Sequence, residues 1–152
     1  LRQIRKNPVL FLSGGDVELG TKTLMENGMA ESIRKAHASG TLCMGLSAGS
    51  IMLASEWVRW PDPETETVAE RFPCLDLATL ICDTHAEKES WAELKTLLRL
   101  SPEGTLGFGI PSQAGLCVAP DGSVSALGDL PIELFLHRKG TIVPVRPMTG
   151  KK

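Results

Sequence analysis

The most chemically suggestive part of the sequence is a serine between two glycines. Residues 45–49 read Gly-Leu-Ser-Ala-Gly, directly after the apolar run 41–44 and directly before the small and apolar residues 50–54. This order predicts a nucleophile elbow, in which a strand, a tight turn and a helix place Ser47 at the apex. The glycines let the strand and the helix pack closely around a strained backbone. The chemistry that such a serine supports is nucleophilic attack on a carbonyl carbon.

Attack on a carbonyl creates an oxyanion, which needs nearby N–H donors. The amide of Ala48 opens the helix that follows the elbow and points at the space in front of Ser47. Residues 14–16 read Gly-Gly-Asp after another apolar run, and the Gly15 amide is the second donor that we expect. An ordinary strand-to-helix turn, with Asp16 as a helix cap, is the alternative for this segment.

A serine hydroxyl also needs a base, and histidine is the usual one. The chain has three histidines. His37 lies near the end of a predicted helix, and His137 lies in a late hairpin beside two basic residues, where we expect it to be solvated. His85 follows the apolar run 77–82 at a strand end and is the one placed for catalysis. The alternative is a histidine that merely ends a strand.

The elements that must position these residues can be read from the apolar periodicity. Short apolar runs predict buried strands, and an amphipathic stretch ended by Gly40 predicts a helix. A second predicted helix has leucines and Trp91 on one face, and the polar, Pro-rich and Glu-rich segment 56–73 predicts a long surface loop. The strands expected are 8–13, 41–44, 77–82 and 106–110, and the first helix is 17–38.

The C-terminal part has a different pattern. Residues 115–119 and 123–127 flank an Asp-Gly turn, and residues 132–137 and 141–145 flank Lys-Gly, so both pairs predict hairpins. The fold class expected is α/β, a doubly wound, mostly parallel sheet with helices on both faces and an antiparallel C-terminal end. In such a sheet the carboxyl ends of the strands gather the serine, the histidine and the double glycine at one edge.

The composition excludes several classes of function. The chain has 152 residues, enough for a single domain over 1–152, and its formal net charge is −2 without a basic patch that would invite nucleic acid. The apolar stretches are too short to span a membrane. Four cysteines are widely spaced and indicate buried thiols in a reducing, cytoplasmic compartment. No cluster of metal-ligating residues is present in the sequence, so neither a metal nor another cofactor is expected.

Four segments together carry a family resemblance: residues 11–16, 45–50, 83–85 and 107–110. Their order and spacing resemble those of the dipeptidase E and cyanophycinase family of serine peptidases, which share the class I glutamine amidotransferase-like fold, over about residues 8–127. The resemblance implies Ser47 as the nucleophile, His85 as the general base, and the amides of Gly15 and Ala48 as the oxyanion hole. It further implies small peptide substrates, typically dipeptides with an aspartyl residue at the amino side.

The third member of the triad departs from the pattern. Cyanophycinase-like members have a glutamate just after the Gly-x-Gly-Ile strand, where this chain has Pro-Ser-Gln at residues 111–113. Dipeptidase E-like members have an aspartate in the loop after the elbow, and Asp62 is the nearest match. Asp83 is an alternative orienting carboxylate. It is two residues from His85, and side chains two residues apart on a strand lie on the same face.

The start of the chain departs as well. It opens on Leu1, whereas members of the family usually begin with further strand-helix units. We therefore expect the domain to lack those N-terminal units. A sheet without them would expose an apolar edge.

Two functions remain in competition. The first is a serine-type peptidase that cleaves short peptides through an acyl-enzyme, with Arg59 as a candidate partner for a substrate carboxylate and the segment 56–73 as a cover. The second is a non-catalytic relative that binds a small molecule or a partner, favoured by the altered residues 111–113. An amidotransferase is disfavoured, because its elbow nucleophile is cysteine and Cys43 lies four residues too early. The expected partner is a small peptide, with no nucleic acid or membrane, and a homodimer is compatible with the sequence.

Overall fold

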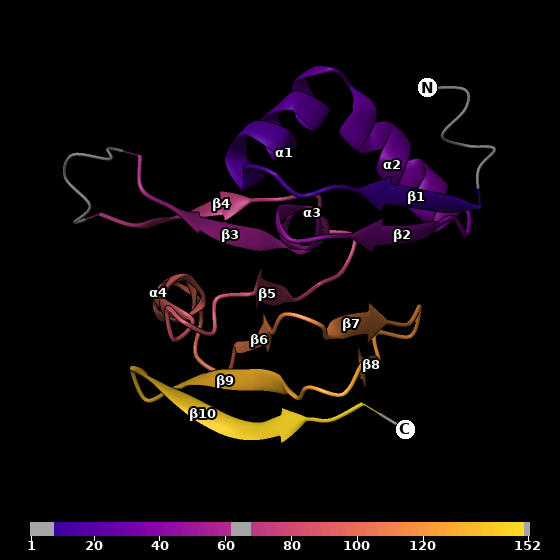
Figure 1. The fold of residues 1–152 in the computed structure, drawn as a ribbon. Coiled ribbons are helices and arrows are strands. Elements are labelled where there is room, and N and C mark those ends of the chain that lie inside the picture. The colour runs from indigo at the N-terminus through magenta and orange to yellow at the C-terminus, as the bar shows by residue number, and fades with distance from the viewer. Residues whose placement is uncertain (1–7, 62–67, 151–152) are drawn as a thin grey trace.

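The computed structural model describes residues 8–61 and 68–150 (Figure 1). Figure 1 shows α1 and α2 beside β1 and β2 at one end of the molecule, with β9 and β10 at the other end. In chain order the elements are β1 (Val9–Leu12), α1 (Val17–Glu26), α2 (Met29–Ala38), β2 (Leu42–Gly45), α3 (Ala48–Leu53), β3 (Glu56–Arg59), β4 (Glu70–Pro73), β5 (Ile81–Thr84), α4 (Ala92–Leu100), β6 (Leu106–Ile110), β7 (Gly115–Val118), β8 (Val124–Leu127), β9 (Ile132–Arg138) and β10 (Thr141–Met148).

The predicted α/β class and the antiparallel C-terminal end are confirmed by the pairing of the strands. Strands β1 and β2 are parallel, and so are β5 and β6. The sheet that contains β5 and β6 continues antiparallel through β9 to β10, and β7 pairs with β8 in a separate hairpin. Within the described residues, parallel pairing is confined to β1–β2 and β5–β6. These two pairs place the ends of β1, β2 and β5 in one region of the molecule.

The first helical stretch is divided, so the prediction of one helix over residues 17–38 is wrong. Helix α1 ends at Glu26, and α2 starts at Met29. Between them Gly28 has a φ of 67°, a left-handed conformation that glycine adopts at no steric cost. At the other end of α1, the side chain of Asp16 accepts a hydrogen bond from the Leu19 amide at 2.7 Å, so Asp16 is the predicted N-cap.

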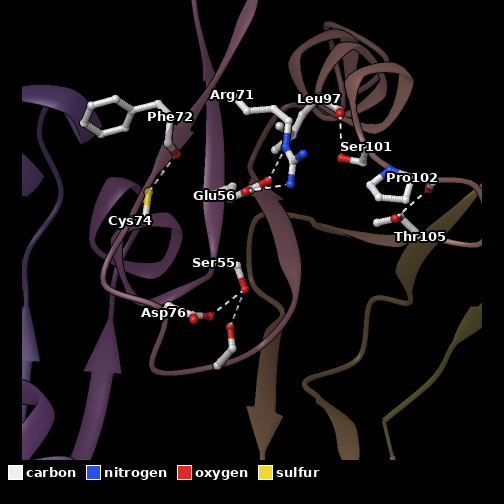
Figure 2. Close-up of polar contacts among 11 residues, drawn as sticks. Ser55, Glu56, Arg71, Phe72, Cys74, Asp76, Leu97, Ser101, Pro102 and Thr105 are labelled. Carbon is white, nitrogen blue, oxygen red and sulfur yellow. Dashed lines mark hydrogen bonds and ion pairs between the residues drawn. The ribbon is translucent and has the colours of Figure 1, made fainter.

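The polar segment 56–73 is not a loop throughout, because its two ends form the antiparallel pair β3–β4. Figure 2 shows Arg71 of β4 reaching across to Glu56 of β3, with both guanidinium contacts at 2.7 Å. A bidentate pair of this kind fixes the register of two strands that have few apolar residues. Ser55 donates to the Asp76 carboxylate at 2.8 Å and so fastens the start of β3 to the segment after β4 (Figure 2).

The apolar core has a main part around α3, a second part around α4 and a small third part under α2. The first two parts lie next to β5. Ile51 and Met52 of α3 pack in a cluster with Phe72, Phe108 and Ile132. The second cluster gathers the apolar face of α4 against the sheet and consists of Val58, Ile81, Trp91, Leu94, Leu97, Leu98 and Phe135. The α3 and α4 clusters meet at β5, which contributes Cys82 to the first and Ile81 to the second, so the strand that leads to His85 is packed on both faces.

Two glycines of β6 make room for α4. A methyl group on Gly107 would lie 2.9 Å from the side chains of Leu94 and Leu98, and one on Gly109 would lie 2.8 Å from the Trp91 ring. Trp91 is only 2% exposed, so its ring has no space to move into. The Gly-Phe-Gly-Ile segment is therefore a packing motif that seats α4 against the sheet.

The change Gly109→Ala is expected to lower the free energy of unfolding by about 1–3 kcal/mol, because it overpacks the core at Trp91. Urea denaturation followed by circular dichroism measures this. Gly115→Ala on β7 is the matched control, since its added methyl group would lie at an ordinary 3.6 Å from Leu127. Equal unfolding energies for the two variants would contradict the packing role of Gly109.

The burial of one histidine and one cysteine differs from what the sequence predicts. His137 is buried rather than solvated, with Nδ1 2.9 Å from the Ser101 carbonyl oxygen. Cys74 and Cys82 are buried as expected, and burial raises the pKa of each thiol to about 12. Cys117, in contrast, is exposed.

One face of the β1–β2 pair is apolar and open. Val9 pairs with Leu42 and Phe11 with Met44, and these four side chains are 46%, 56%, 56% and 47% exposed in the order Val9, Phe11, Leu42, Met44. Parallel strands are usually covered on both faces, so this exposure is unusual.

No helix in the described part of the chain is long and apolar enough to cross a bilayer.

Candidate active site

The elbow at Ser47 has the strained geometry that the sequence predicts. Ser47 lies between β2 and α3 with φ 53° and ψ −125°, a conformation that non-glycine residues rarely adopt. Side chains on the flanking glycines would collide with backbone, at 2.4 Å from the Ser50 nitrogen for Gly45 and at 2.2 Å from the Leu12 oxygen for Gly49. The two glycines are therefore required by the close approach of β1, β2 and α3, and this approach holds Ser47 at the apex.

His85 is brought to the same place by β5. It follows the last residue of that strand with a φ of 45°, and its amide donates to the Ile110 carbonyl at the end of β6 at 2.9 Å. Its Nε2 lies 2.7 Å from Ser47 Oγ. The structure thus joins the two residues that the sequence singled out as nucleophile and base, from strand ends that are far apart along the chain.

The direction of this hydrogen bond depends on the tautomer of His85. For Ser47 to donate its proton, Nε2 must be the unprotonated nitrogen and Nδ1 must carry the hydrogen. No hydrogen bond links Nδ1 to a residue that the structure describes. A group that accepts from Nδ1–H would complete the Ser-His arrangement as a triad.

Neither candidate for the third member is seen in that role. Asp62 lies outside the described residues. Asp83 is only 5% exposed, and its Oδ1 accepts a hydrogen bond from the Thr84 amide at 2.7 Å. Its Oδ2 is buried without a hydrogen-bond partner among the described residues. Asp83 therefore lies beside the Ser47–His85 pair but is not hydrogen-bonded to His85.

Burial raises the pKa of Asp83 above its ordinary value, against the lowering influence of the Thr84 amide, the nearby His85 and the Leu94 amide. An acid whose pKa is higher in the folded than in the unfolded state binds protons more tightly when folded. The ionised form of Asp83 is therefore destabilising. The free energy of unfolding decreases as the pH rises from the unfolded-state pKa, near 3.8, through the higher pKa of the folded state.

The change Asp83→Asn is accordingly expected to increase the free energy of unfolding at neutral pH, with a gain that shrinks toward pH 4. Urea titrations of both proteins across this range measure the difference. Asp129→Asn, at an exposed position, is the control and should show no such pH-dependent gain. A loss of stability at neutral pH in Asp83→Asn would mean that the ionised carboxylate is well compensated where it lies.

A carboxylate that the sequence analysis did not consider holds the His85 segment in place. Glu87 Oε1 accepts a hydrogen bond from the Ser112 amide at 2.5 Å, which ties the turn after β5 to the turn after β6. Its own amide and that of Ser112 lower the pKa of Glu87, and His85 lowers it further. Nothing in the sequence marks Glu87, which is one of several charged residues in an exposed run; only the folded contact with residues 111–113 distinguishes it.

The two predicted oxyanion donors lie beside Ser47. Gly15 and Ala48 both line the cleft in front of the hydroxyl, and the neighbouring Gly14 is so close that a methyl group on it would be 3.2 Å from Ser47 Cβ. In the described part of the chain neither the Gly15 nor the Ala48 N–H donates to a backbone carbonyl. Both amides are thus available to an anion, as an oxyanion hole requires.

The cleft in front of Ser47 has a volume of about 340 Å³. Its described lining comes from the turn after β1 and the start of α1, from Ser47 and α3, from β3, from the end of β5 and the turn after it, and from the start of α4: Gly15, Val17, Ser47, Ala48, Ile51, Trp57, Asp83, Thr84, His85, Ala86, Glu89, Ala92 and Glu93. Trp57, Glu89 and Glu93 were not foreseen, since the segment 56–73 was expected to be a loop and the start of α4 has no motif.

Arg59 does not serve as the predicted partner for a substrate carboxylate in this structure. Its guanidinium is paired with Glu18 at 2.9 Å and with Glu70, whose Oε1 lies 2.6 Å from Nε. It also lies over the ring of Phe72 at 5.1 Å from the centroid. Arg59 is not part of the described cleft lining, so its charge serves to join α1 to the β3–β4 pair.

Comparison of the whole fold with solved structures found several similar chains, among them the following two. A peptidase from an acI-B1 Actinobacterium matches with a TM-score of 0.74 and 18% identity, covering 99% of this chain and 60% of the other. A putative peptidase E protein from Listeria monocytogenes EGD-e matches with a TM-score of 0.52 and 16% identity, covering 95% of this chain and 62% of the other. The chain therefore spans about three fifths of the length of these two structures, which it resembles in fold.

Comparison of the sequence with protein families identifies the family of this chain. A search of curated proteins gave no significant match. The family model of peptidase family S51, in contrast, matches residues 1–123, which include the elbow, His85 and the Gly-Phe-Gly-Ile strand. On this match over most of its length, the chain belongs to peptidase family S51.

Proposed function

We propose that this protein is a serine-type peptidase that hydrolyses short peptides through an acyl-enzyme on Ser47. The observation that carries the proposal is the 2.7 Å hydrogen bond between Ser47 Oγ and His85 Nε2 at a strained elbow. Family membership supports the same reaction class. The size of the cleft, about 340 Å³, suits a short peptide better than a folded protein.

The reaction follows from the positions of these groups. Ser47 Oγ attacks the carbonyl carbon of the scissile bond while His85 Nε2 takes the hydroxyl proton. The negative charge that develops on the carbonyl oxygen is stabilised by the amides of Gly15 and Ala48. His85 then gives its proton to the leaving nitrogen, the C–N bond breaks, and Ser47 is left acylated. Water, activated by the same histidine, releases the acid and restores the hydroxyl.

A third residue that orients His85 is part of the proposal. Asp62, outside the described residues, and Asp83, in the cleft, are the two candidates from the sequence, and Glu87 fixes the turn that carries His85 through Ser112. Losing the orienting carboxylate of a Ser-His pair lowers turnover by roughly four orders of magnitude. Comparing Asp62→Asn, Asp83→Asn and Glu87→Gln in one assay identifies the residue by the largest loss in kcat.

Covalent labelling tests the proposal against the alternative of a non-catalytic relative. A fluorophosphonate forms a stable bond only with an activated serine, so peptide mapping of the treated wild type is expected to find the label on Ser47. His85→Ala should label slowly, and Ser47→Ala should not label at that position. A folded wild-type protein that takes up no label would favour a binding protein, which is the second candidate because residues 111–113 lack the glutamate of cyanophycinase-like members.

A further inference from the structure

The position of the His85 ring depends on the turn that carries it. This turn, residues 85–91, leads from β5 to α4, and His85 enters it with a φ of 45°. The His85 amide donates to the Ile110 carbonyl at 2.9 Å. Apart from the contact between Nε2 and Ser47 Oγ, the ring makes no hydrogen bond with a residue that the structure describes. The direction of the imidazole is therefore set by how firmly the backbone of the turn is fixed.

Glu87 fastens this turn to the turn that follows β6. Its Oε1 accepts a hydrogen bond from the Ser112 amide at 2.5 Å, across 25 residues of sequence. The amide of Glu87 itself and that of Ser112 lower the pKa of Glu87, so the carboxylate is ionised at neutral pH and its bond to Ser112 is charge-assisted. His85 lowers this pKa further, as expected for a ring within electrostatic reach of the carboxylate.

The turn after β6 leaves the Ser112 amide available for this bond. Gln113 has a φ of 69°, and the Ala114 amide donates to the Pro111 carbonyl at 3.1 Å. Residues 111–114 thus form a type II turn with Ser112 at its second position. The amide of that position takes no part in the hydrogen bond that closes such a turn, and it has no backbone acceptor among the described residues. The carboxylate of Glu87 supplies the missing acceptor.

Two hydrogen bonds therefore join the turns after β5 and β6. The first runs from the His85 amide to Ile110, and the second from the Ser112 amide to Glu87, two residues further along both segments. The second bond extends the parallel pairing of β5 and β6 beyond the ends of the strands, with a side-chain oxygen in place of a backbone carbonyl. With the first bond alone, the turn could pivot about Ile110. The second bond prevents that movement.

We propose that Glu87 is a positioning residue for His85: through the Ser112 amide, its carboxylate fixes the turn so that Nε2 stays within hydrogen-bonding distance of Ser47 Oγ. Glu87 is not part of the described cleft lining, and no hydrogen bond joins it to His85 Nδ1. Its effect on the reaction thus passes through the placement of His85. The inference rests on the proposed function for its effect on turnover, whereas the placement of the ring can be measured without turnover.

Kinetics of Glu87 variants test the first part. Glu87→Ala is expected to lower kcat for a short peptide at least about tenfold with little change in KM, since misplacing a catalytic group costs turnover rather than binding. Glu87→Gln keeps an oxygen that accepts from Ser112 and should restore kcat to within about threefold of the wild type. Glu103→Ala is the matched control. It removes a similar bond, from the Gly140 amide to Glu103 Oε1 at 2.9 Å, near the other end of β6, and should keep the wild-type kcat.

The donor of the hydrogen bond provides a second variant. Proline is favoured at the second position of a type II turn, so Ser112→Pro removes the N–H in a turn that accommodates the ring. Its kcat should fall as far as that of Glu87→Ala, and combining the two changes should cost no more than either alone. Ser112→Ala loses the same hydroxyl but keeps the N–H, so the difference between the two Ser112 variants isolates the amide.

The ring of His85 gives a readout that needs no catalysis. In protein labelled with ¹⁵N-histidine, the change in the Nε2 chemical shift of His85 on going to Ser47→Ala reports the contact between the two residues. This change should shrink by at least about half in the Glu87→Ala background and keep its wild-type size in Glu103→Ala. An undiminished change in the Glu87→Ala background, or a kcat for Glu87→Gln as low as that for Glu87→Ala, would overturn the inference. A folded wild type that hydrolyses no peptide would refute the proposed function, and the shift comparison would still decide the role of Glu87.

Discussion

Replacing His85 by alanine is expected to lower kcat/KM for a short peptide by at least about 10⁴-fold, and replacing Ser47 by alanine should have an effect at least as large. The reason is the 2.7 Å contact between Ser47 Oγ and His85 Nε2, through which the hydroxyl loses its proton as it attacks. Hydrolysis of a panel of dipeptides and dipeptide amides, followed by release of the new amino group, measures the loss. His37→Ala on α2 is the matched control and should retain wild-type activity, because His37 is exposed and is not part of the cleft lining.

The double variant makes this prediction sharper. Residues that act as a unit lose nearly all of their contribution when either is removed. The change Ser47→Ala combined with His85→Ala should therefore be no slower than Ser47→Ala alone. Losses that multiply in the double variant would show that the two residues act independently, and the hydrogen bond would then have no catalytic role.

Gly49→Ala is expected to be the most destabilising of the glycine substitutions, lowering the free energy of unfolding by about 3 kcal/mol or more. Its methyl group would lie 2.2 Å from the Leu12 carbonyl oxygen and 2.7 Å from the Ser13 carbonyl oxygen, so backbone of β1 would have to move. That movement would separate the elbow from the turn that carries Gly15. Urea denaturation measures the stability, and fluorophosphonate labelling reports whether Ser47 is still activated.

A second glycine in contact with a movable neighbour provides the contrast. A methyl group on Gly20 in α1 would meet the Met52 side chain at 2.6 Å, and a flexible thioether can turn away whereas a backbone carbonyl cannot. The higher helix propensity of alanine, worth about 1 kcal/mol, offsets part of the cost. Gly20→Ala should therefore remain within about 1 kcal/mol of the wild type. Equal losses at Gly20 and Gly49 would show that the elbow is more adaptable than its contacts indicate.

The parts of the fold that follow local rules could be predicted from the sequence. The Asp-Gly turn fixed the hairpin of β7 and β8, and the apolar run 106–110 is β6 to the residue. The segment 56–73 could not be assigned correctly from its composition. Its strand pair depends on the bidentate contact between Arg71 and Glu56, which links residues that sequence rules assign to solvent. Gly28 divides the first helical stretch. A glycine can adopt either a helical or a left-handed conformation, so the apolar periodicity of the sequence does not reveal whether the helix continues through it.

The candidate site also contains some residues that the sequence predicts and others that only the folded contacts reveal. The placement of Gly15, Ser47, Ala48 and His85 around one cleft could be predicted because these residues follow strands, and parallel strands bring such positions to one edge. The charge of the cleft could not, because Glu89, Glu93 and Trp57 come from elements whose facing surfaces are set by packing. Asp83 was recognised as a carboxylate near His85, but its hydrogen bond to the Thr84 amide is a local contact that a periodicity argument does not reveal.

Trapping the acyl-enzyme tests the central claim most directly. The wild-type protein is mixed with an activated ester of a short peptide, quenched in acid within milliseconds, and analysed by intact-mass and peptide-mapping spectrometry. We expect one acyl group on the peptide that contains Ser47, and none on that residue in Ser47→Ala. Hydrolysis of the ester without any acyl group on Ser47 would contradict the account, because the reaction would then proceed without the nucleophile that the elbow presents.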